Sequence, residues 1–137
     1  MELRLADYVA DYAAIRAIRF AVFVDEQRVP PELEMDEHDA ACLHAVAFDG
    51  AHAIATGRLL PDGHIGRMAV LREFRGKGLG GSLLEKLVET ARNRGHREAL
   101  LSAQVHALEF YRRHGFETFG KVYQEAGIPH QDMRRRL

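Results

Sequence analysis

The chain has 137 residues, of which 47% are hydrophobic, and its 19 Lys and Arg against 20 Asp and Glu leave a formal net charge of -1. This length suits one domain with one core, and the composition excludes dominant disorder and a global field that attracts nucleic acid. Cys42, the single cysteine, excludes a disulfide scaffold and a thiolate zinc cluster. Because no apolar run has transmembrane length and the N-terminus lacks a secretory signal pattern, we expect a cytoplasmic protein without a membrane partner.

The N-terminal third predicts an edge strand, an amphipathic helix and an acidic segment. Residues 3–5 alternate as a short strand does, and Asp7 or Asp11 stands where a residue would cap the helix that follows. The apolar positions of that helix are Ile15, Ile18, Val22 and Phe23, and it ends near Val24. Two prolines and seven acidic residues then fall within residues 25–39, which indicates a loop or a short helical turn.

Three strands in an antiparallel meander are predicted next, over residues 44–48, 52–60 and 65–70. The turns between them are marked by Asp49-Gly50 and by Pro61-Asp62-Gly63. Connections this short join antiparallel strands.

The C-terminal half alternates helices with strands. Apolar residues on one face predict a helix over 79–94 that is closed by Gly95, followed by a buried strand over 99–103. Because a helix connects that strand to residues 65–70, the two strands should run parallel. The pattern ends with a short helix over 107–114, which is stopped by Gly115. Two closing strands follow, over 116–119 and 132–136, with chain breaks between them at Gly127 and Pro129. The predicted fold class is α/β, with a mixed, mostly antiparallel sheet of about six to seven strands flanked by helices.

A basic, glycine-rich loop from Arg75 to Ser82 lies between the third meander strand and the long helix. Glycines let the backbone adopt positive φ and approach a ligand closely. The free amides at a helix N-terminus bind anions, and Arg75 and Lys77 add positive charge. The alternative is a turn that only joins a strand to a helix.

The same loop contains the dinucleotide pattern G-x-G-x-x-G at Gly76, Gly78 and Gly81. Its context disfavours a nicotinamide-dependent oxidoreductase, because the preceding strand belongs to an antiparallel meander and only residues 82–137 follow. Gln104 also stands where a ribose-binding acid is needed. The loop lacks the Gly-Lys-Ser/Thr of a P-loop.

This loop and a second motif together resemble the GCN5-related N-acetyltransferases. Arg75-x-x-Gly78-x-Gly80 is similar to that family's acyl-CoA pyrophosphate loop, and Tyr111 before Gly115-Phe116 resembles its second signature. A narrower resemblance is to the bacterial ElaA-like, or YjcF-like, branch of the family. It lies in residues 23–27, the acidic segment, residues 104–106 and residues 125–130. The resemblance covers nearly the whole chain and implies one N-acetyltransferase domain over residues 1–137.

The resemblance implies how acetyl-CoA binds. Strands 65–70 and 99–103 are expected to splay into a V, with the backbone of residues 68–70 along the pantetheine arm and around the developing oxyanion. The amides of residues 76–81 are expected to hold the pyrophosphate. The implied cofactor-binding residues are Met68, Ala69, Val70, Arg75, Gly76, Lys77, Gly78, Leu79, Gly80, Gly81 and Gln104. Gln104, an asparagine in many relatives, either contacts the pantetheine or caps the helix from residue 107; Arg112 and Arg113 either reach the CoA phosphates or are solvated.

Direct attack by an amine on the thioester needs an acid and a base. Tyr111 matches the family's acid, and a phenol pKa of ~10 suits a thiolate of pKa ~8.5; the alternative is a core tyrosine. His130 is the first candidate for the base, His106 is the second, and Glu26, acting through a water, is the third.

The acceptor is expected between the first helix, with its acidic segment, and the closing strands. The acids either attract a cationic amine or, as most charge runs do, form a solvated face. Arg19 and Arg67 would instead hold a carboxylate, and Glu26 is a further candidate for contact with the substrate. The sequence does not choose between these acceptors.

Asp36, His38 and Asp39 lack the companion ligands of a metal site, so no metal is expected. The three arginines at 134–136 are too few for nucleic-acid recognition. The implied function is acetyl transfer from acetyl-CoA to a primary amine of a small molecule or peptide in a ternary complex. The alternatives are a non-catalytic acyl-CoA-binding domain and, more remotely, a dinucleotide-dependent oxidoreductase. A homodimer, common among such domains, stays open.

Overall fold

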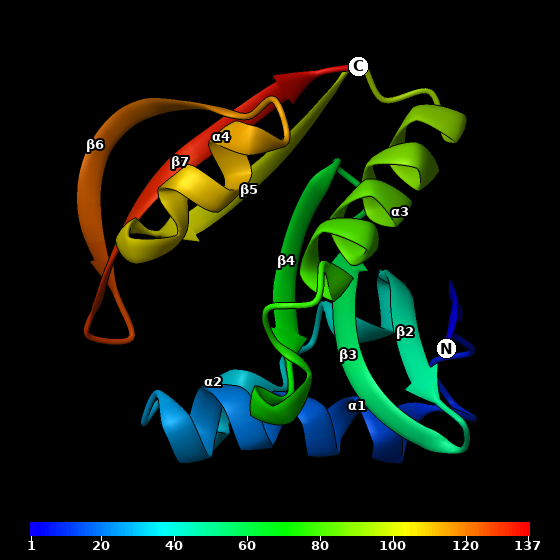
Figure 1. Ribbon diagram of the computed structural model, residues 1–137. Coiled ribbons are helices and arrows are strands. Elements are labelled where there is room, and N and C mark those ends of the chain that lie inside the picture. The colour runs from blue at the N-terminus through cyan, green and yellow to red at the C-terminus, as the bar shows by residue number, and fades with distance from the viewer.

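One seven-stranded sheet organises the chain in the computed structural model, which describes residues 1–137 (Figure 1). The strand order is β1-β2-β3-β4-β5-β7-β6, and only β4 and β5 run parallel. The strands are β1 (Glu2–Leu5), β2 (Leu43–Asp49), β3 (His52–Leu59), β4 (His64–Val70), β5 (Glu98–Gln104), β6 (Glu117–Glu125) and β7 (Ile128–Arg136). The predicted mixed α/β sheet and its parallel pair are confirmed.

Four α-helices and four other helical segments connect the strands. They are α1 (Tyr12–Arg19), the π-helical η1 (Phe20–Glu26), α2 (Pro31–Glu34), α3 (Leu79–Asn93) and α4 (Leu108–Arg113), with 3-10 turns η2 (Asp39–Ala41), η3 (Arg72–Phe74) and η4 (Val105–Ala107). None of these helices is long and apolar enough to cross a bilayer.

The N-terminal helix extends further than its apolar pattern predicts, because α1 continues as η1 to Glu26. Asp11 does occupy the N-cap position of α1, but its side chain makes no cap hydrogen bond there. Its carboxylate instead accepts hydrogen bonds from Arg4 at 3.0 and 3.2 Å. The Asp7 carboxylate accepts the amides of the turn before the helix. Of the two predicted caps, Asp7 therefore caps the turn before the helix, and Asp11 holds the N-cap position without a side-chain cap.

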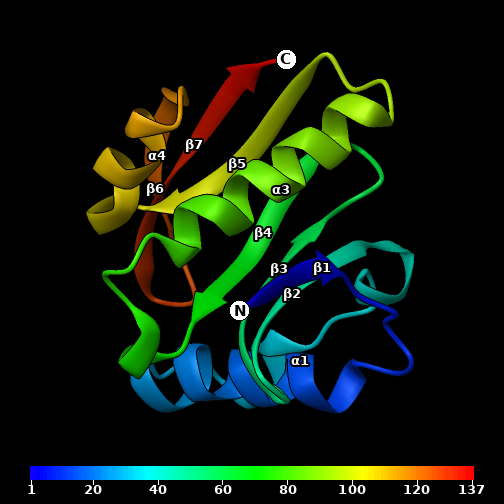
Figure 2. The same ribbon diagram turned by 45° about the vertical axis from the view of Figure 1, so that its right-hand side comes forward.

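Helices α3 and α1 cover opposite faces of the N-terminal part of the sheet (Figure 2). Leu83, Leu87 and their neighbours on α3 are fully buried against β3, and a Cβ at Gly57 would lie 2.8 Å from Leu87 Cδ1. The next residue, Arg58, points to the opposite face because side chains alternate along a strand. There it contacts Asp39, which also binds Arg19 of α1.

The parallel strands β4 and β5 separate after a short contact. Their pairing is confined to His64 with Leu100 and Ile65 with Leu101, and beyond these residues the strands diverge (Figure 1). On its other edge β4 carries a bulge, because Arg67 and Met68 together lie opposite the single residue Gly57 of β3. The predicted splay of the two strands is therefore present.

The closing hairpin is longer than predicted. Strands β6 and β7 continue toward each other as far as a tight turn at Ala126 and Gly127, where both residues have positive φ (52° and 76°). Pro129 lies within β7, opposite Gln124 of β6. The pairing of β7 with β5 begins at the next residue, His130, so Pro129 lies just outside it. Its missing N–H therefore leaves no carbonyl of β5 unpaired. The prediction was wrong here because Gly127 belongs to a tight turn and Pro129 is accommodated within β7, so neither residue marks a long break.

Candidate active site

A cleft of about 1500 Å³ opens where β4 and β5 diverge. Its walls are the backbone of β4, the glycine loop, α4 and the turn between β6 and β7. The sequence-predicted residues that line it are Glu26, Arg67, Met68, Ala69, Val70, Arg75, Gly76, Gly78, Leu79, Gly80, Gly81, Gln104, His106, Tyr111 and His130. Lys77 and Arg19 do not line it. Most of the candidate residues therefore meet in one cleft.

The glycine loop leaves the N-terminus of α3 open. Gly78 is the N-cap residue, with φ of 80°. No side chain caps the helix, and its first turn contains no acidic residue. Gly81 lies against His114, since a Cβ there would be 3.0 Å from the imidazole Nε2. A left-handed glycine and free amides are the features that let a helix N-terminus bind a phosphate.

Arg75 fastens the start of this loop to two other elements. Its Nε donates to the Val70 carbonyl at 2.9 Å, and its two terminal nitrogens donate to the Glu26 carboxylate at 2.9 and 2.8 Å. The hydrogen bonds from Arg75 lower the pKa of Glu26, which makes this carboxylate a weaker proton acceptor.

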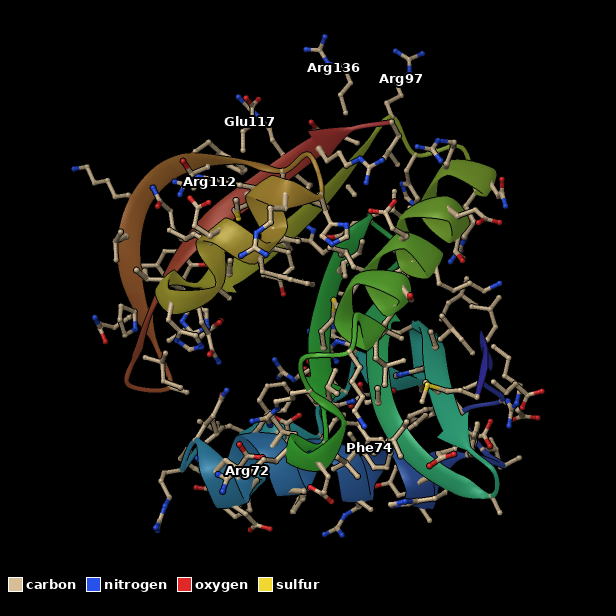
Figure 3. The ribbon with its side chains drawn as sticks, in the orientation of Figure 1. Arg72, Phe74, Arg97, Arg112, Glu117 and Arg136 are labelled. Carbon is tan, nitrogen blue, oxygen red and sulfur yellow. The ribbon has the colours of Figure 1, made fainter.

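Lys77 turns toward η3 rather than toward the cleft. Its ammonium lies 5.7 Å from the centre of the Phe74 ring. Figure 3 labels Phe74 and Arg72 on this turn, which leads from β4 into the glycine loop.

Tyr111 lines the cleft from α4. Its ring packs edge-on against the rings of Phe110 and Phe116, with centroid distances of 5.0 and 6.1 Å. Burial raises the pKa of Tyr111 to about 12, because the phenolate would lose its hydration. The hydroxyl is therefore protonated at every physiological pH, but it is a weaker acid than the sequence-based match to a thiolate assumes.

His130 lies on β7 with 7% of its surface exposed. Its Nδ1 is 2.7 Å from the Ile128 carbonyl, an arrangement in which a neutral ring carries its proton on Nδ1. Nε2 is then an acceptor, and it lies 3.5 Å from the Glu125 carboxylate. The Tyr123 ring stacks on the imidazole at a centroid distance of 6.1 Å.

Gln104 at the end of β5 pairs with Gln27, which follows η1. The two amides exchange hydrogen bonds of 2.7 and 3.3 Å. Gln104 precedes η4, but its side chain makes no cap hydrogen bond, so the predicted cap is wrong. The reason is that the amide pair links the two arms of the cleft instead. His106, in η4, is exposed and lines the same cleft.

A buried network of charges lies under the acidic segment. The fully buried Arg19 donates to Glu34 and to Asp39, at 2.8 Å each. Arg58 donates to Asp39 at 2.8 Å and to Asp36 at 2.7 Å. Arg19 is therefore bound within the protein and does not reach the cleft, where the acceptor substrate was expected. The acidic segment is only partly the solvated face that its charge run predicts. The missed signal is that Arg19 falls four residues after Ile15, on the buried stripe of the helix.

The ionisation of these acids follows from their partners. Burial raises the pKa of Glu34 despite the adjacent guanidinium of Arg19. Burial would also raise the pKa of Asp36, but hydrogen bonding and charge from Arg58 outweigh it and lower that pKa to about 2. Asp36 is therefore a stable anion at neutral pH.

Arg67 connects this network to the cleft. Its Nε donates to the Glu34 carbonyl at 3.2 Å, and its Nη2 donates to the Leu33 carbonyl and to Asp36, both at 3.3 Å. Its side chain is 29% exposed and lines the cleft. The sequence predicted this residue at the acceptor site but not the contacts that fix it.

Cys42 lies outside the cleft. Its thiol donates to the His38 carbonyl at 3.2 Å, and burial raises its pKa. The cleft therefore offers no thiolate nucleophile. No three His, Cys, Asp or Glu side chains are grouped as a metal site requires.

Comparisons with known proteins find the same domain across the chain. A family model described as an acetyltransferase (GNAT) domain matches residues 6–137. The Bacillus subtilis protein called uncharacterized N-acetyltransferase YjcF is 37% identical over 122 residues, which cover 86% of this chain and 87% of that protein. The crystal structure of Escherichia coli ElaA has a TM-score of 0.90 at 30% identity and covers 99% of this chain and 100% of its own. That of an acyl-CoA N-acyltransferase from Pseudomonas aeruginosa has a TM-score of 0.88 at 31% identity, covering 98% of this chain and 99% of its own.

Proposed function

We propose that this chain, which belongs to the GNAT acetyltransferase family, transfers the acetyl group of acetyl-CoA to a primary amine of a small molecule or peptide. The family uses acyl-CoA as its donor. The observation that carries the proposal is the cleft between β4 and β5, with the open N-terminus of α3 in its wall and with Tyr111 and His130 brought to it from different elements. The cytoplasm, where a lone thiol stays reduced, is the compartment that we propose.

The donor arm fits along β4. Beyond Ile65, the edge of β4 that faces β5 has no strand partner, so its backbone groups are free to pair with the amides of a pantetheine arm, as an added strand would. The uncapped amides of the glycine loop support the pyrophosphate. The backbone near Ala69 and Val70 supplies the donors for the oxyanion.

The chemistry that we propose is direct transfer in a ternary complex. The amine nitrogen forms a bond to the thioester carbonyl carbon, and the carbon–sulfur bond breaks. His130 Nε2 takes the proton that the amine loses, and the Tyr111 hydroxyl donates a proton to the departing thiolate. The absence of a cysteine from the cleft supports this route over one that passes through a thioester on the protein.

His130 is preferred as the base because the Ile128 carbonyl fixes the ring with Nε2 as an acceptor. His106 is exposed and is the second candidate. Glu26 is the weakest candidate, since Arg75 holds both of its carboxylate oxygens.

Thermal unfolding with acetyl-CoA, CoA, NADH, NADPH and ATP tests donor binding. A ligand at a hundredfold excess over its Kd stabilises the native state by about 2.7 kcal/mol, which raises the Tm of a domain of this size by several degrees. We expect a shift with the two CoA species and none with the nicotinamide nucleotides. A shift with nicotinamide nucleotides alone would contradict the proposal.

A matched pair of glycine variants places the bound donor at the loop. Gly78 and Gly50 both have positive φ (80° and 61°) and open space around the added Cβ, so Gly78→Ala and Gly50→Ala carry a similar kind of backbone strain. Only Gly78→Ala should reduce the shift caused by acetyl-CoA. If both variants keep the full thermal shift with acetyl-CoA, the glycine loop does not bind the donor.

A further inference from the structure

Arg67 is held in an unusual backbone conformation at the floor of the cleft. It is one of three non-glycine residues with positive φ, at 50°, and it lies in the bulge of β4. A left-handed conformation is strained for a residue with a long side chain. Such strain persists where the surrounding structure enforces it, and it is concentrated at functional positions. The bulge thus fixes where the guanidinium begins.

The guanidinium of Arg67 is fastened along one edge only. Its Nε and Nη2 donate to the carbonyls of Glu34 and Leu33 and to the Asp36 carboxylate. Nη1 has no partner in the protein, and it is not a buried orphan, because Arg58 Nε is the only buried side-chain nitrogen or oxygen without one. Because Arg67 lines the cleft, Nη1 is a pre-oriented, solvent-accessible donor at its floor.

The charges around Arg67 are balanced, so the free N–H groups of its Nη1 can bind an anion. The connected groups are the cations Arg19, Arg58 and Arg67 and the anions Glu34, Asp36 and Asp39. Three formal positive charges meet three formal negative ones, and each acid is already bonded to a guanidinium. An arriving carboxylate therefore meets a free N–H donor and no unpaired anion.

The opposite arm of the cleft carries the complementary charge. Glu125, 56% exposed in side chain, lies 3.5 Å from His130 Nε2, so an incoming ammonium meets a carboxylate beside the proposed base. Leu33, whose carbonyl binds Arg67, is 52% exposed and lines the same cleft, where it offers an apolar contact. The cleft therefore presents an anion-binding group, an apolar surface and a cation-attracting group to one acceptor.

We infer that the acceptor is a small amino carboxylate whose carboxylate binds Nη1 of Arg67 while its amine faces His130. The inference rests on the proposed acyl transfer and names its substrate class. A diamine would satisfy Glu125 but would place its second ammonium beside the Arg67 guanidinium, and this contact between like charges is unfavourable.

The test compares matched acceptors on the unaltered protein. The standard L-amino acids, β-alanine and 4-aminobutyrate are each assayed with acetyl-CoA against the corresponding primary amide and decarboxylated amine. The ω-amino pairs control for the lower basicity of α-amino amides. We expect kcat/KM for at least one amino carboxylate to exceed that of its amide by about tenfold or more, as loss of a charge-assisted hydrogen bond predicts.

Substitution of Arg67 then assigns the preference. In Arg67→Met the ratio of kcat/KM between carboxylate and amide should collapse toward one, and because this ratio is taken within one variant, partial unfolding cancels. Arg97→Met is the matched control, since Arg97 lies outside the cleft at the far end of β5 (Figure 3). Its ratio should equal that of the unaltered protein.

Binding measurements separate failure of this inference from failure of the proposed function. Thermal shifts of the CoA-saturated protein should be larger with the preferred amino carboxylate than with its amide, whether or not turnover occurs. If no amine is acetylated, the proposed function fails and these shifts alone decide the inference. Amides or diamines that bind and react as well as the carboxylates, or an Arg67→Met variant that keeps the preference, would overturn it.

Discussion

The carboxylate of Glu26 accepts two hydrogen bonds from the guanidinium of Arg75, at 2.9 and 2.8 Å. This pair joins the end of η1 to the start of the glycine loop, while Arg75 Nε binds the Val70 carbonyl at the end of β4. Three separate segments are thereby held in one arrangement at one end of the cleft. If acetyl-CoA binds at the glycine loop as proposed, we expect Glu26 to act on its binding through Arg75.

Glu26→Gln should weaken donor binding without removing a catalytic group. A neutral amide cannot replace two charge-assisted hydrogen bonds, so we expect the KM for acetyl-CoA to rise by about fivefold with kcat nearly unchanged. Steady-state kinetics with acetyl-CoA as the varied substrate measure this. Asp25→Asn, an exposed neighbour, is the control. A fall in kcat at constant KM would instead identify Glu26 as the base.

Tyr111→Phe should lower kcat by more than ~10-fold and leave acetyl-CoA affinity nearly unchanged, because the ring packing is kept and only the proton donor is lost. Thiol release gives kcat, and the thermal shift gives affinity. Tyr12→Phe, at an exposed tyrosine of α1, should have no effect. Equal rates for Tyr111→Phe and the unaltered protein would leave this residue as a core tyrosine.

The raised pKa of Tyr111 has a consequence for the pH–rate profile. With a pKa of about 12, the phenol does not ionise in the assay range, so no loss of rate below about pH 10 should arise from Tyr111. The profile of kcat from pH 6 to 10 measures this. An alkaline loss of rate in that range that disappears in Tyr111→Phe would contradict the assignment.

His130→Gln should lower kcat by about 100-fold, the usual size of a general-base contribution. His106→Gln should lower it little, since that side chain is exposed and second in rank. Both variants are compared at saturating acetyl-CoA and several pH values. A larger loss in His106→Gln than in His130→Gln would exchange the two roles.

Arg19→Met should destabilise the fold by about 3–5 kcal/mol, because Glu34 and Asp39 lose the buried guanidinium that they share, and Glu34 keeps only the longer contact with Arg67. Urea unfolding gives the free energy. Arg16→Met, an exposed arginine of the same helix, should change it by less than about 0.5 kcal/mol. If Arg19→Met and Arg16→Met change the free energy of unfolding by equally small amounts, the ion pairs of Arg19 do not stabilise the fold beyond the packing that methionine retains.

Local sequence patterns predicted most of the fold. Apolar periodicity located α3, and its position between residues 65–70 and 99–103 required their strands to be parallel, as β4 and β5 are. The end of α1 and the length of the closing hairpin were missed. The first depends on a π-helical continuation to Glu26, and the second on a turn at Ala126 and Gly127 that glycine and proline alone do not distinguish from a longer loop.

The cleft was predictable in outline, but its side-chain pairings were not. Arg19 with Asp39 and Gln27 with Gln104 join residues 20 and 77 positions apart, and no local periodicity records such contacts. Arg75 was predicted from its place in the glycine loop, yet its partner Glu26 is 49 residues away. Pairings of this kind arise from the tertiary fold, which brings segments that are distant in the sequence into contact.

The most direct test of acyl transfer is the stoichiometry of its two products. The protein is incubated with acetyl-CoA and the preferred amine, and free CoA thiol and N-acetylated amine are measured in the same samples over time. We expect one amide to form for each thiol released, and the rates of both to fall together in Tyr111→Phe. Thiol release without amide formation, or acetyl-CoA binding with no thiol release in the presence of any amine, would contradict it.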